Sequence, residues 1–294
     1  IFNRILPLGD SVILCPAHGA GSLCGANIAD RDESTLGFER LSNPMLQMSR
    51  DDFIKFKKSQ KLEMPHYFRR MEKYNIEGAP LLGCLPLPAP LAPDEFKSQM
   101  ERGDSVVDTG SPSSFGGAHI HGAYSIWLGA LSVLAGWVLP YDKPILLVME
   151  DQSHLDKAVR YLIRIGYDNI AGYLKDGMRS WYNAGFDTGR LSLLTVHEFK
   201  AKLDKRETLN IIDVRTSGEW ESGHIQGSQN IYVGNLPSEV GGLTRQKPAA
   251  ILCNTGFRAG LGASVLLREG CREVYNVLGG MTAWKAAGYP VAKD

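Results

Sequence analysis

Residues 249–258 read AAILCNTGFR and decide the fold of the second half of the chain. Four apolar residues, a length typical of a buried strand, lead into Cys253, and Leu261, Val265 and Leu266 then follow at a spacing that predicts a helix. A strand that turns through a short loop into a helix is the repeating unit of a parallel α/β sheet. Such proteins keep their sites at the carboxyl-terminal edge of the strands, so we expect Cys253 to lie at that edge.

The loop after Cys253 has the composition of an anion-binding turn. Its backbone N–H groups and the positive end of the following helix would converge on the sulfur and favour the thiolate. Gly256 permits the tight turn that this requires, and Arg258 adds a planar cation that suits an oxyanion such as thiosulfate. We therefore predict Cys253 and Arg258 as catalytic residues. The predicted substrate-binding residues lie between them: Asn254, Thr255, Gly256 and Phe257.

Two other interpretations of Cys253 have to be weighed. A cysteine phosphatase also holds an oxyanion over a thiolate, but its loop has one residue more between Cys and Arg than this chain has. The spacing to Arg258 therefore favours sulfur over phosphate. A buried, inert cysteine is the second alternative, and the electropositive setting of the loop argues against it. Cys271, in a turn past the helix, is expected to be a packing or surface thiol.

The sequence around this loop occurs twice, once in an altered form. The later copy has the apolar strand 209–213 ending in an acid, the turn GHIQG at 223–227, the strand at 274–278 and the closing GMTAW at 280–284. The earlier copy has the same order in the strand 106–108, the turn AHIHG at 118–122, the strand 145–148, the helix 155–165 and GMRSW at 177–181. Alternating strands and helices predict an α/β fold with two parallel sheets, each covered by helices on both faces. The predicted domains are 84–190 and 191–294, with a break near 188–191.

The combination of motifs in the later copy resembles the rhodanese (sulfurtransferase) domain. C-x-x-G-x-R follows an apolar strand, D-V-R and G-H-I-x-G precede it, and G-G-M-x-x-W follows, over about residues 191–292. The resemblance implies that Cys253 becomes a persulfide, that Arg258 holds the donor, and that Asp213 and Arg215 support the loop. It also implies a small-molecule sulfur donor and a thiol acceptor, such as thiosulfate, glutathione persulfide or coenzyme A persulfide, and no cofactor.

The earlier copy lacks these chemical groups. Met149 falls at the position of Cys253, with Glu150 next to it, and Gly110 replaces the DVR arginine. A thioether cannot become a persulfide, and Glu150 would repel a thiosulfate anion. His154 stands where Arg258 would be. We therefore expect a non-catalytic rhodanese-like domain that serves as spacer, dimer surface or docking module.

The first eighty residues resemble the C-terminal part of a metallo-β-lactamase-fold (αββα) domain, with persulfide dioxygenase-like proteins fused to rhodanese domains as specific relatives. The stretches that carry the resemblance are a strand at 11–15, PAHGAGSLCG at 16–25, STLGFER at 34–40 and PHYF at 65–68. In that family the histidine of the P-x-H-G turn is a metal ligand, which here is His18. We assign 1–83 to this incomplete domain.

A working metal site is not expected in this chain. The upstream H-x-H-x-D-H cluster of that family is missing, and one histidine cannot supply the facial set of ligands that a catalytic iron keeps. The chain begins at Ile1 without an initiator methionine, so we expect a piece of a longer parent. In an intact parent, iron or zinc could support persulfide oxidation or, as the alternative, thioester hydrolysis, with the rhodanese copies as persulfide carriers. His119 and His121 also form a pair that could share a metal, but no further ligands lie at suitable spacing.

Three further segments have distinctive compositions. Residues 64–78 read as an amphipathic helix, and 85–93, with four prolines, read as a semi-rigid linker. Residues 124–139 carry no charge, but they are shorter than the roughly 20 residues of a membrane-spanning helix and stop at Pro140. We interpret them as a buried helix.

The overall composition fits an ordinary globular protein. Hydrophobic residues make up 44% and charged residues 22% of the 294 residues, and 32 basic residues balance 32 acidic ones. Without a basic excess, nucleic acid and membrane are not expected partners. Five cysteines without a CxxC pair indicate free thiols in a reducing compartment, so a cytoplasmic location is expected. The sequence leaves open whether the chain forms a homo-oligomer. The function that the resemblance implies is a sulfurtransferase, with a non-catalytic persulfide carrier as the alternative.

Overall fold

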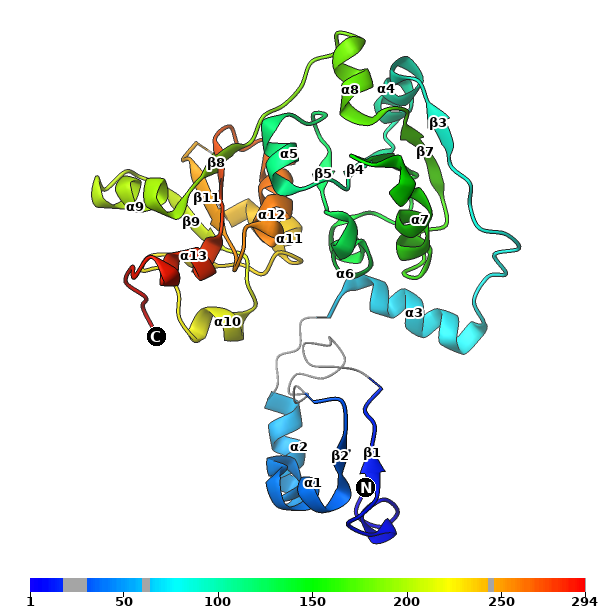
Figure 1. The fold of residues 1–294 in the computed structure, drawn as a ribbon, viewed down its shortest axis with the longest axis vertical. Coiled ribbons are helices and arrows are strands. Elements are labelled where there is room, and N and C mark those ends of the chain that lie inside the picture. Colours follow the sequence, from blue (N-terminus) through cyan, green and yellow to red (C-terminus); the bar gives the residue numbers. More distant parts are fainter. Residues whose placement is uncertain (18–30, 60–63, 243–245, 294) are drawn as a thin grey trace. The chain divides into compact units, whose positions relative to one another are not determined.

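The computed structural model describes residues 1–17, 31–59, 64–242 and 246–293 (Figure 1). The chain divides into two compact units, Ile1–Glu63 and Met64–Asp294, and each is described by itself.

The first unit is a small hairpin with two helices. Strand β1 (Ile13–Leu14) pairs antiparallel with β2 (Ser34–Thr35), and helices α1 (Leu36–Ser42) and α2 (Arg50–Ser59) follow. The predicted strand at 11–15 is confirmed in a shorter form. Helix α1 begins directly at the hairpin because the side chain of Thr35 accepts the N–H of Phe38 at 3.2 Å and caps the first turn.

The second unit contains two five-stranded sheets with the same strand order. The first copy has the order β5-β4-β6-β7-β3 and the second has β10-β9-β11-β12-β8, and every pairing in both is parallel. The strands of the first copy are β3 (Ala89–Leu91), β4 (Ser105–Asp108), β5 (Tyr124–Ser125), β6 (Ile145–Val148) and β7 (Ile170–Leu174). Those of the second are β8 (Ser192–Leu194), β9 (Asn210–Asp213), β10 (Gln229–Asn230), β11 (Ala249–Leu252) and β12 (Val274–Val277). The predicted α/β fold with two parallel sheets is confirmed.

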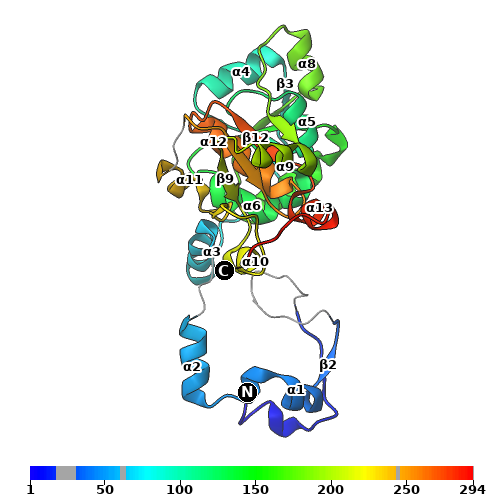
Figure 2. The ribbon, with the colours of Figure 1, turned by 90° about the vertical axis from the view of Figure 1, so that its left-hand side faces the viewer.

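Helices cover both faces of each sheet, as the sequence predicts. In the second copy, α9 and α13 lie on one side and α12 on the other (Figures 1 and 2). Alternate residues of β11 serve the two sides, because Ala250 and Leu252 join one hydrophobic cluster while Ala249 and Ile251 join the other. The helices of the first copy are α4 (Pro93–Glu101), α5 (Pro112–Gly117), α6 (Leu131–Val138), α7 (Leu155–Ile163) and α8 (Gly177–Asn183). Those of the second are α9 (Val196–Asp204), α10 (Ser217–Glu221), α11 (Leu236–Glu239), α12 (Phe257–Arg268) and α13 (Gly280–Ala286).

The proline-rich segment 85–93 is only partly a linker. Its second half forms β3, which pairs in parallel with β7, and Pro93 is the first residue of α4. The linker prediction is therefore wrong from Ala89 onward. Prolines are accepted here because β3 is the edge strand of its sheet and because the first helical position needs no N–H donor.

The uncharged segment 124–139 is buried, as predicted, although it is not a single helix. It forms β5, a short turn and α6, in which six of eight residues are buried. Within the described residues, no helix has both the length and the apolar character that crossing a membrane requires.

Helix α3 (His66–Glu77) confirms the helix predicted at 64–78, and it packs against the first rhodanese-like copy. Tyr67 is buried in that copy's core, and the guanidinium of Arg70 lies 4.6 Å from the ring centroid of Tyr141. These contacts explain why the division between the compact units falls before Met64. The division of the chain into domains 1–83, 84–190 and 191–294 stays a prediction.

The two copies share one hydrophobic core, and α12 lies at its centre. Eight consecutive residues of α12, from 259 to 266, are buried, so the helix has no solvent-facing side. Its own strands β11 and β12 cover one side, and α5 and β5 of the first copy cover the other. The contact includes a hydrogen bond of 3.0 Å from the N–H of Ser125 to Oγ of Ser264. Farther along the interface, the rings of Trp137 and Tyr232 meet edge to face.

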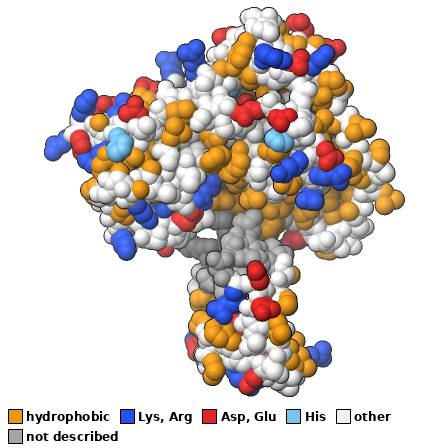
Figure 3. Space-filling model, in the orientation of Figure 1, with side chains coloured by type: hydrophobic (Ala, Val, Ile, Leu, Met, Phe, Trp, Pro, Cys, Tyr) orange, Lys and Arg blue, Asp and Glu red, His pale blue; other side chains and the backbone are white. Residues whose placement is uncertain are grey.

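The surface carries both signs of charge. Lys and Arg side chains are intermingled with Asp and Glu side chains over the face shown in Figure 3. This pattern agrees with the zero net charge of the sequence.

Candidate functional site

Cys253 follows directly after β11, at the carboxyl-terminal edge of the second sheet, where the sequence predicts it. It is a free cysteine with 1% of its surface exposed. The N–H of Gly256 donates to Sγ at 3.1 Å, and Gly256 has the left-handed conformation (φ 97°, ψ −8°) that turns this group toward the sulfur. Helix α12 begins at the next residue, so the sulfur lies beside a helix N-terminus.

The closing GGM motif holds the loop from outside. The N–H groups of Met281 and Thr282 donate to the carbonyls of Cys253 and Asn254 at 2.8 and 3.0 Å. Gly280 makes this approach feasible, because a Cβ there would lie 2.0 Å from the carbonyl oxygen of Cys253. The motif is therefore a backbone clamp on the cysteine loop.

Asn276 is a second support for the loop, and the sequence analysis missed it. It lies on β12 without any exposed surface, and its Nδ2 donates to the carbonyl of Gly256 at 3.0 Å. Its Oδ1 has no hydrogen-bond partner among the described residues. The available signal was an asparagine in the middle of the apolar strand VYNVL, since a buried polar side chain needs a partner.

Arg258 is paired with Glu219, which the sequence analysis also missed. Two guanidinium nitrogens donate to the carboxylate at 2.7 and 2.8 Å, and Nδ2 of Asn254 donates to the same carboxylate at 2.7 Å. Glu219 thus connects both ends of the loop. The role of Arg258 in holding a donor stays a prediction, because this carboxylate already takes two of its N–H groups.

The ion pair shifts the pKa values of Glu219 and Arg258 in the directions that favour their charged forms. Burial alone would raise the pKa of Glu219, but hydrogen bonds from Arg258 and Thr216 outweigh burial and lower this pKa to about 2. Burial alone would lower the pKa of Arg258, yet its hydrogen bond and charge interaction with Glu219 raise it. The pair is therefore ionised throughout the range in which proteins work.

Asp213 and Arg215 form a buried ion pair beneath this pair, with 0% and 2% of their surfaces exposed. Arg215 donates through Nε and Nη2 to Asp213 at 2.7 to 3.0 Å. It also donates to the carbonyls of Glu219 at 3.0 Å and Gly223 at 2.9 Å. Arg215 thus holds the backbone of Glu219, whose carboxylate binds the loop, while the supporting role of Asp213 and Arg215 stays a prediction.

The remaining loop residues form its outer rim. Thr255 is exposed and Asn254 is half-buried. Phe257 is 40% exposed, and its ring meets Trp127 of the first copy edge to face at 5.1 Å between centroids. The first copy therefore contacts the rim of the Cys253 loop.

Met149 occupies the place of Cys253 in the first copy. Val148 pairs with Asp108 across the sheet as Leu252 pairs with Asp213, so the next residues, Met149 and Cys253, correspond. Met149 is 3% exposed. The structure thus agrees with the prediction that this copy lacks the nucleophile.

The predicted metal ligand His18 lies outside the described residues. In the described parts of the chain, no group of three or more His, Cys, Asp or Glu residues is arranged to hold a metal ion. His119 is buried, lies stacked on Phe115 at 3.9 Å, and shares a hydrogen bond of 2.9 Å with its carbonyl. His121 instead pairs with Asp187 at 3.2 Å. The histidine pair is therefore used in structural contacts, which does not favour the metal interpretation.

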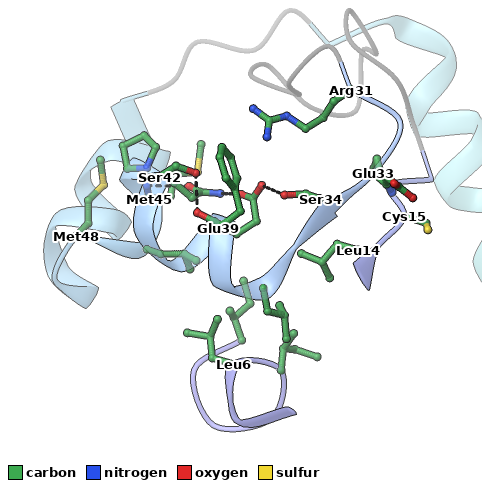
Figure 4. A pocket seen from close by; sticks show the side chains of 18 of the residues that line it. Leu6, Leu14, Cys15, Arg31, Glu33, Ser34, Glu39, Ser42, Met45 and Met48 are labelled. Atoms are coloured by element: carbon green, nitrogen blue, oxygen red, sulfur yellow. Dashed lines mark hydrogen bonds between the residues drawn. The ribbon is translucent and has the colours of Figure 1, made fainter. Parts of the chain in front are cut away.

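The first unit has a cavity of about 910 Å³ with a mainly apolar lining (Figure 4). Glu39 lies in it and accepts hydrogen bonds from Oγ of Ser34 at 2.6 Å and Nδ2 of Asn43 at 2.8 Å. These bonds lower the pKa of Glu39. Through these two bonds the Glu39 carboxylate connects the two ends of α1, so Glu39 has a structural role.

Comparison with known proteins identifies the class to which this fold and site belong. The model of the rhodanese-like domain matches residues 92–184 and again 195–287, more than half of the chain, and the chain belongs to this family. The chain is 36% identical over 94 residues to the uncharacterized protein YqhL of Bacillus subtilis (strain 168), which covers 32% of this chain and 72% of that protein. It is 34% identical over 85 residues to the thiosulfate sulfurtransferase GlpE of Pseudoalteromonas translucida (strain TAC 125), which covers 29% and 80%. Family and relatives together support sulfurtransferase activity.

A solved structure is also similar to part of the chain. The crystal structure of a metallo-beta-lactamase from Staphylococcus aureus subsp. aureus COL is 30% identical, with a TM-score of 0.48, and the match covers 57% of this chain and 46% of that one. The assignment of 1–83 to that fold stays a prediction.

Proposed function

We propose that this protein transfers sulfane sulfur through a persulfide on Cys253. The observation that carries the proposal is the position of Sγ, at the end of β11 and 3.1 Å from the donating N–H of Gly256. The N–H of Gly256 holds the sulfur in place at the N-terminus of α12, and the thiolate is the form of a cysteine that acts as a nucleophile.

The reaction runs in two displacement steps. The Cys253 thiolate attacks the outer sulfur of thiosulfate, the S–S bond breaks, and sulfite leaves with the electron pair. The thiolate of an acceptor then attacks the outer sulfur of the Cys253 persulfide. The second S–S bond breaks, the acceptor leaves as its persulfide, and the Cys253 thiolate is restored. No net oxidation occurs and no cofactor takes part. Glutathione or coenzyme A persulfide can replace thiosulfate as the donor in the same scheme.

The test is sulfur transfer from thiosulfate to cyanide, measured as thiocyanate. We expect turnover by the unchanged chain and none by Cys253→Ser. Cys84→Ser is the matched control, because Cys84 is exposed and lies outside the loop. Activity that survives in Cys253→Ser would show that another group carries the sulfur.

The alternative is a persulfide carrier without turnover. Intact mass spectrometry after exposure to glutathione persulfide distinguishes this carrier from the enzyme. A stable gain of about 32 Da, one sulfur atom on the nucleophile, without steady-state thiocyanate production supports the carrier. Turnover at Cys253 supports the enzyme.

For a longer chain that contains this one, we propose, on the sequence resemblance of residues 1–83, a metal-dependent persulfide dioxygenase or a thioester hydrolase that works beside the rhodanese pair. His18 would be one of its ligands. The test is metal analysis of the full-length gene product, in which iron or zinc should be stoichiometric and should be lost on His18→Ala. A parent without bound metal would contradict the proposal.

A further inference from the structure

The two rhodanese-like copies differ at the position of Arg215, although its surroundings are preserved. In the second copy, the Arg215 side chain donates to the Asp213 carboxylate and to the carbonyls of Glu219 and Gly223. In the first copy, the aligned turn reads DTGSPSSFGGAH from residue 108, so Gly110 stands in place of the arginine. The counterparts of the three partners are Asp108, Ser114 and Ala118.

A cavity of about 90 Å³ lies beside the counterparts of the groups that bind the Arg215 guanidinium. Its lining includes all three counterparts, and the full lining is Asp108, Ser114, Ala118, Val148, Met149, Glu150, Met178 and Tyr182. A water molecule needs only about 10–15 Å³ of such space, so the cavity has room for a group of several heavy atoms. The first copy has thus kept the socket of an arginine side chain without the arginine.

Asp108, which lines this socket, is buried, with 6% of its surface exposed. Its Oδ1 accepts the N–H of Gly110 at 2.8 Å, as Asp213 accepts the N–H of Arg215 at 3.0 Å. Among the described residues, no cation is paired with Asp108, whereas Asp213 has its arginine. A buried carboxylate without a counter-charge is costly, and a bound cation would remove that cost.

Glu150 adds a second carboxylate beside Asp108. Its Oε1 accepts the N–H of Ser111 at 3.1 Å, and a Cβ on Gly110 would lie 2.9 Å from it. Glu150 is exposed, and Tyr182 is 48% exposed, so the lining of the socket reaches solvent.

We propose that the first copy binds a guanidinium group from outside the chain, in the socket that Arg215 fills in the second copy. The group belongs either to a small guanidino compound or to an arginine side chain of another protein. A planar cation with several N–H donors matches two carboxylates and the backbone carbonyls, and it can lie against the ring of Tyr182. A hard divalent metal would instead need about six oxygen ligands.

The experiment is calorimetric titration of the whole chain with N-methylguanidinium at pH 8. We expect saturable binding with one site, and a loss of about tenfold or more in Asp108→Asn, because removing one partner of a buried charge pair costs several kcal/mol. Asp168→Asn makes the same change at an exposed position and should bind normally. N-methylurea has a similar shape without charge and should not bind. Equal binding by Asp108→Asn, or tighter binding of Ca²⁺ or Mg²⁺, would overturn the proposal.

Two further ligands distinguish the sources of the group. Tighter binding of free L-arginine than of acetyl-Gly-Arg-Gly-amide supports a small molecule, and the reverse order supports a protein side chain. Failure of both to bind would contradict the proposal.

Gly110→Arg provides an independent check, because it supplies the guanidinium from within. The new side chain requires Glu150 to move, which its exposed carboxylate end can do. We expect a higher Tm and no binding of N-methylguanidinium, while thiocyanate production at Cys253 is unchanged. Binding as tight as in the unchanged chain would contradict the location of the socket. Cys253→Ser should bind normally, so failure of the sulfur-transfer proposal leaves this one testable.

Discussion

Replacing Asp108 by asparagine should stabilise the protein, and the gain should grow with pH. Burial raises the pKa of Asp108 from 3.8 to about 7, against the smaller effect of the hydrogen bond from Gly110 and with a further contribution from Glu150. In the unfolded chain the carboxyl titrates near its ordinary value. Between these two values the folded state binds more protons than the unfolded state, so stability falls as pH rises.

The magnitude follows from the size of the shift. A shift of about three pKa units corresponds to about 4 kcal/mol, since each unit is worth about 1.4 kcal/mol. This loss of stability is absent below pH 4 and complete above pH 7. Asparagine has nearly the same shape and no charge, so Asp108→Asn should be more stable than the unchanged chain at pH 8 by about 2–4 kcal/mol. At pH 5 the difference should be much smaller.

The assay is urea unfolding at pH 5 and pH 8, with Asp168→Asn as the exposed control. Urea is required as the denaturant, because guanidinium chloride would supply the ligand proposed for the same socket. An equal effect of Asp108→Asn at both pH values would refute the reasoning, since it would show that the carboxyl does not titrate between them.

Two further predictions concern the catalytic loop. Glu219→Gln should destabilise the chain by about 2 kcal/mol at pH 7, because it leaves Arg258 without its ion partner in a partly buried position. Because the pKa of Glu219 is lowered to about 2, the ionised carboxylate contributes to stability above pH 4.5, and this contribution is lost as pH falls toward 2. The urea midpoints of the variant and the unchanged chain should therefore converge at low pH. A constant difference between them would argue against the ion pair. Gly280→Ala should abolish thiocyanate production and cost about 3 kcal/mol or more, since its Cβ would lie 2.0 Å from the Cys253 carbonyl oxygen. Gly288→Ala also has a positive φ but nothing within 4 Å, so it should cost only about 1 kcal/mol and keep activity; equal losses in both would mean that backbone conformation alone matters.

The loop from Cys253 to Arg258 was predictable from sequence because its parts are local. Cys253, Gly256 and Arg258 lie within one strand-turn-helix unit, and periodicity alone places that unit in a parallel sheet. The position of Met149 was predictable for the same reason, because the strands of the first copy pair in the same register as those of the second.

The groups that complete the loop come from distant parts of the sequence and were missed. Glu219 is 39 residues before Arg258 and reaches it only because β9 and β11 are neighbours in the sheet. Two glutamates flank Trp220, and spacing does not show which one faces the loop. The burial of α12 on two sides also depends on tertiary packing. The small residues of α12 allow the first copy to pack closely on this helix, which the sequence of the second copy alone does not show.

The position of α12 makes the second rhodanese-like copy depend on the first for its packing. The second copy carries the Cys253 loop, but its central helix would expose an apolar side to water if the first copy were deleted. The first copy supplies the contact surface around Ser125 and Trp137 whether or not it has chemistry of its own. A copy that has methionine in place of the cysteine thus covers the central helix of the copy that has the cysteine.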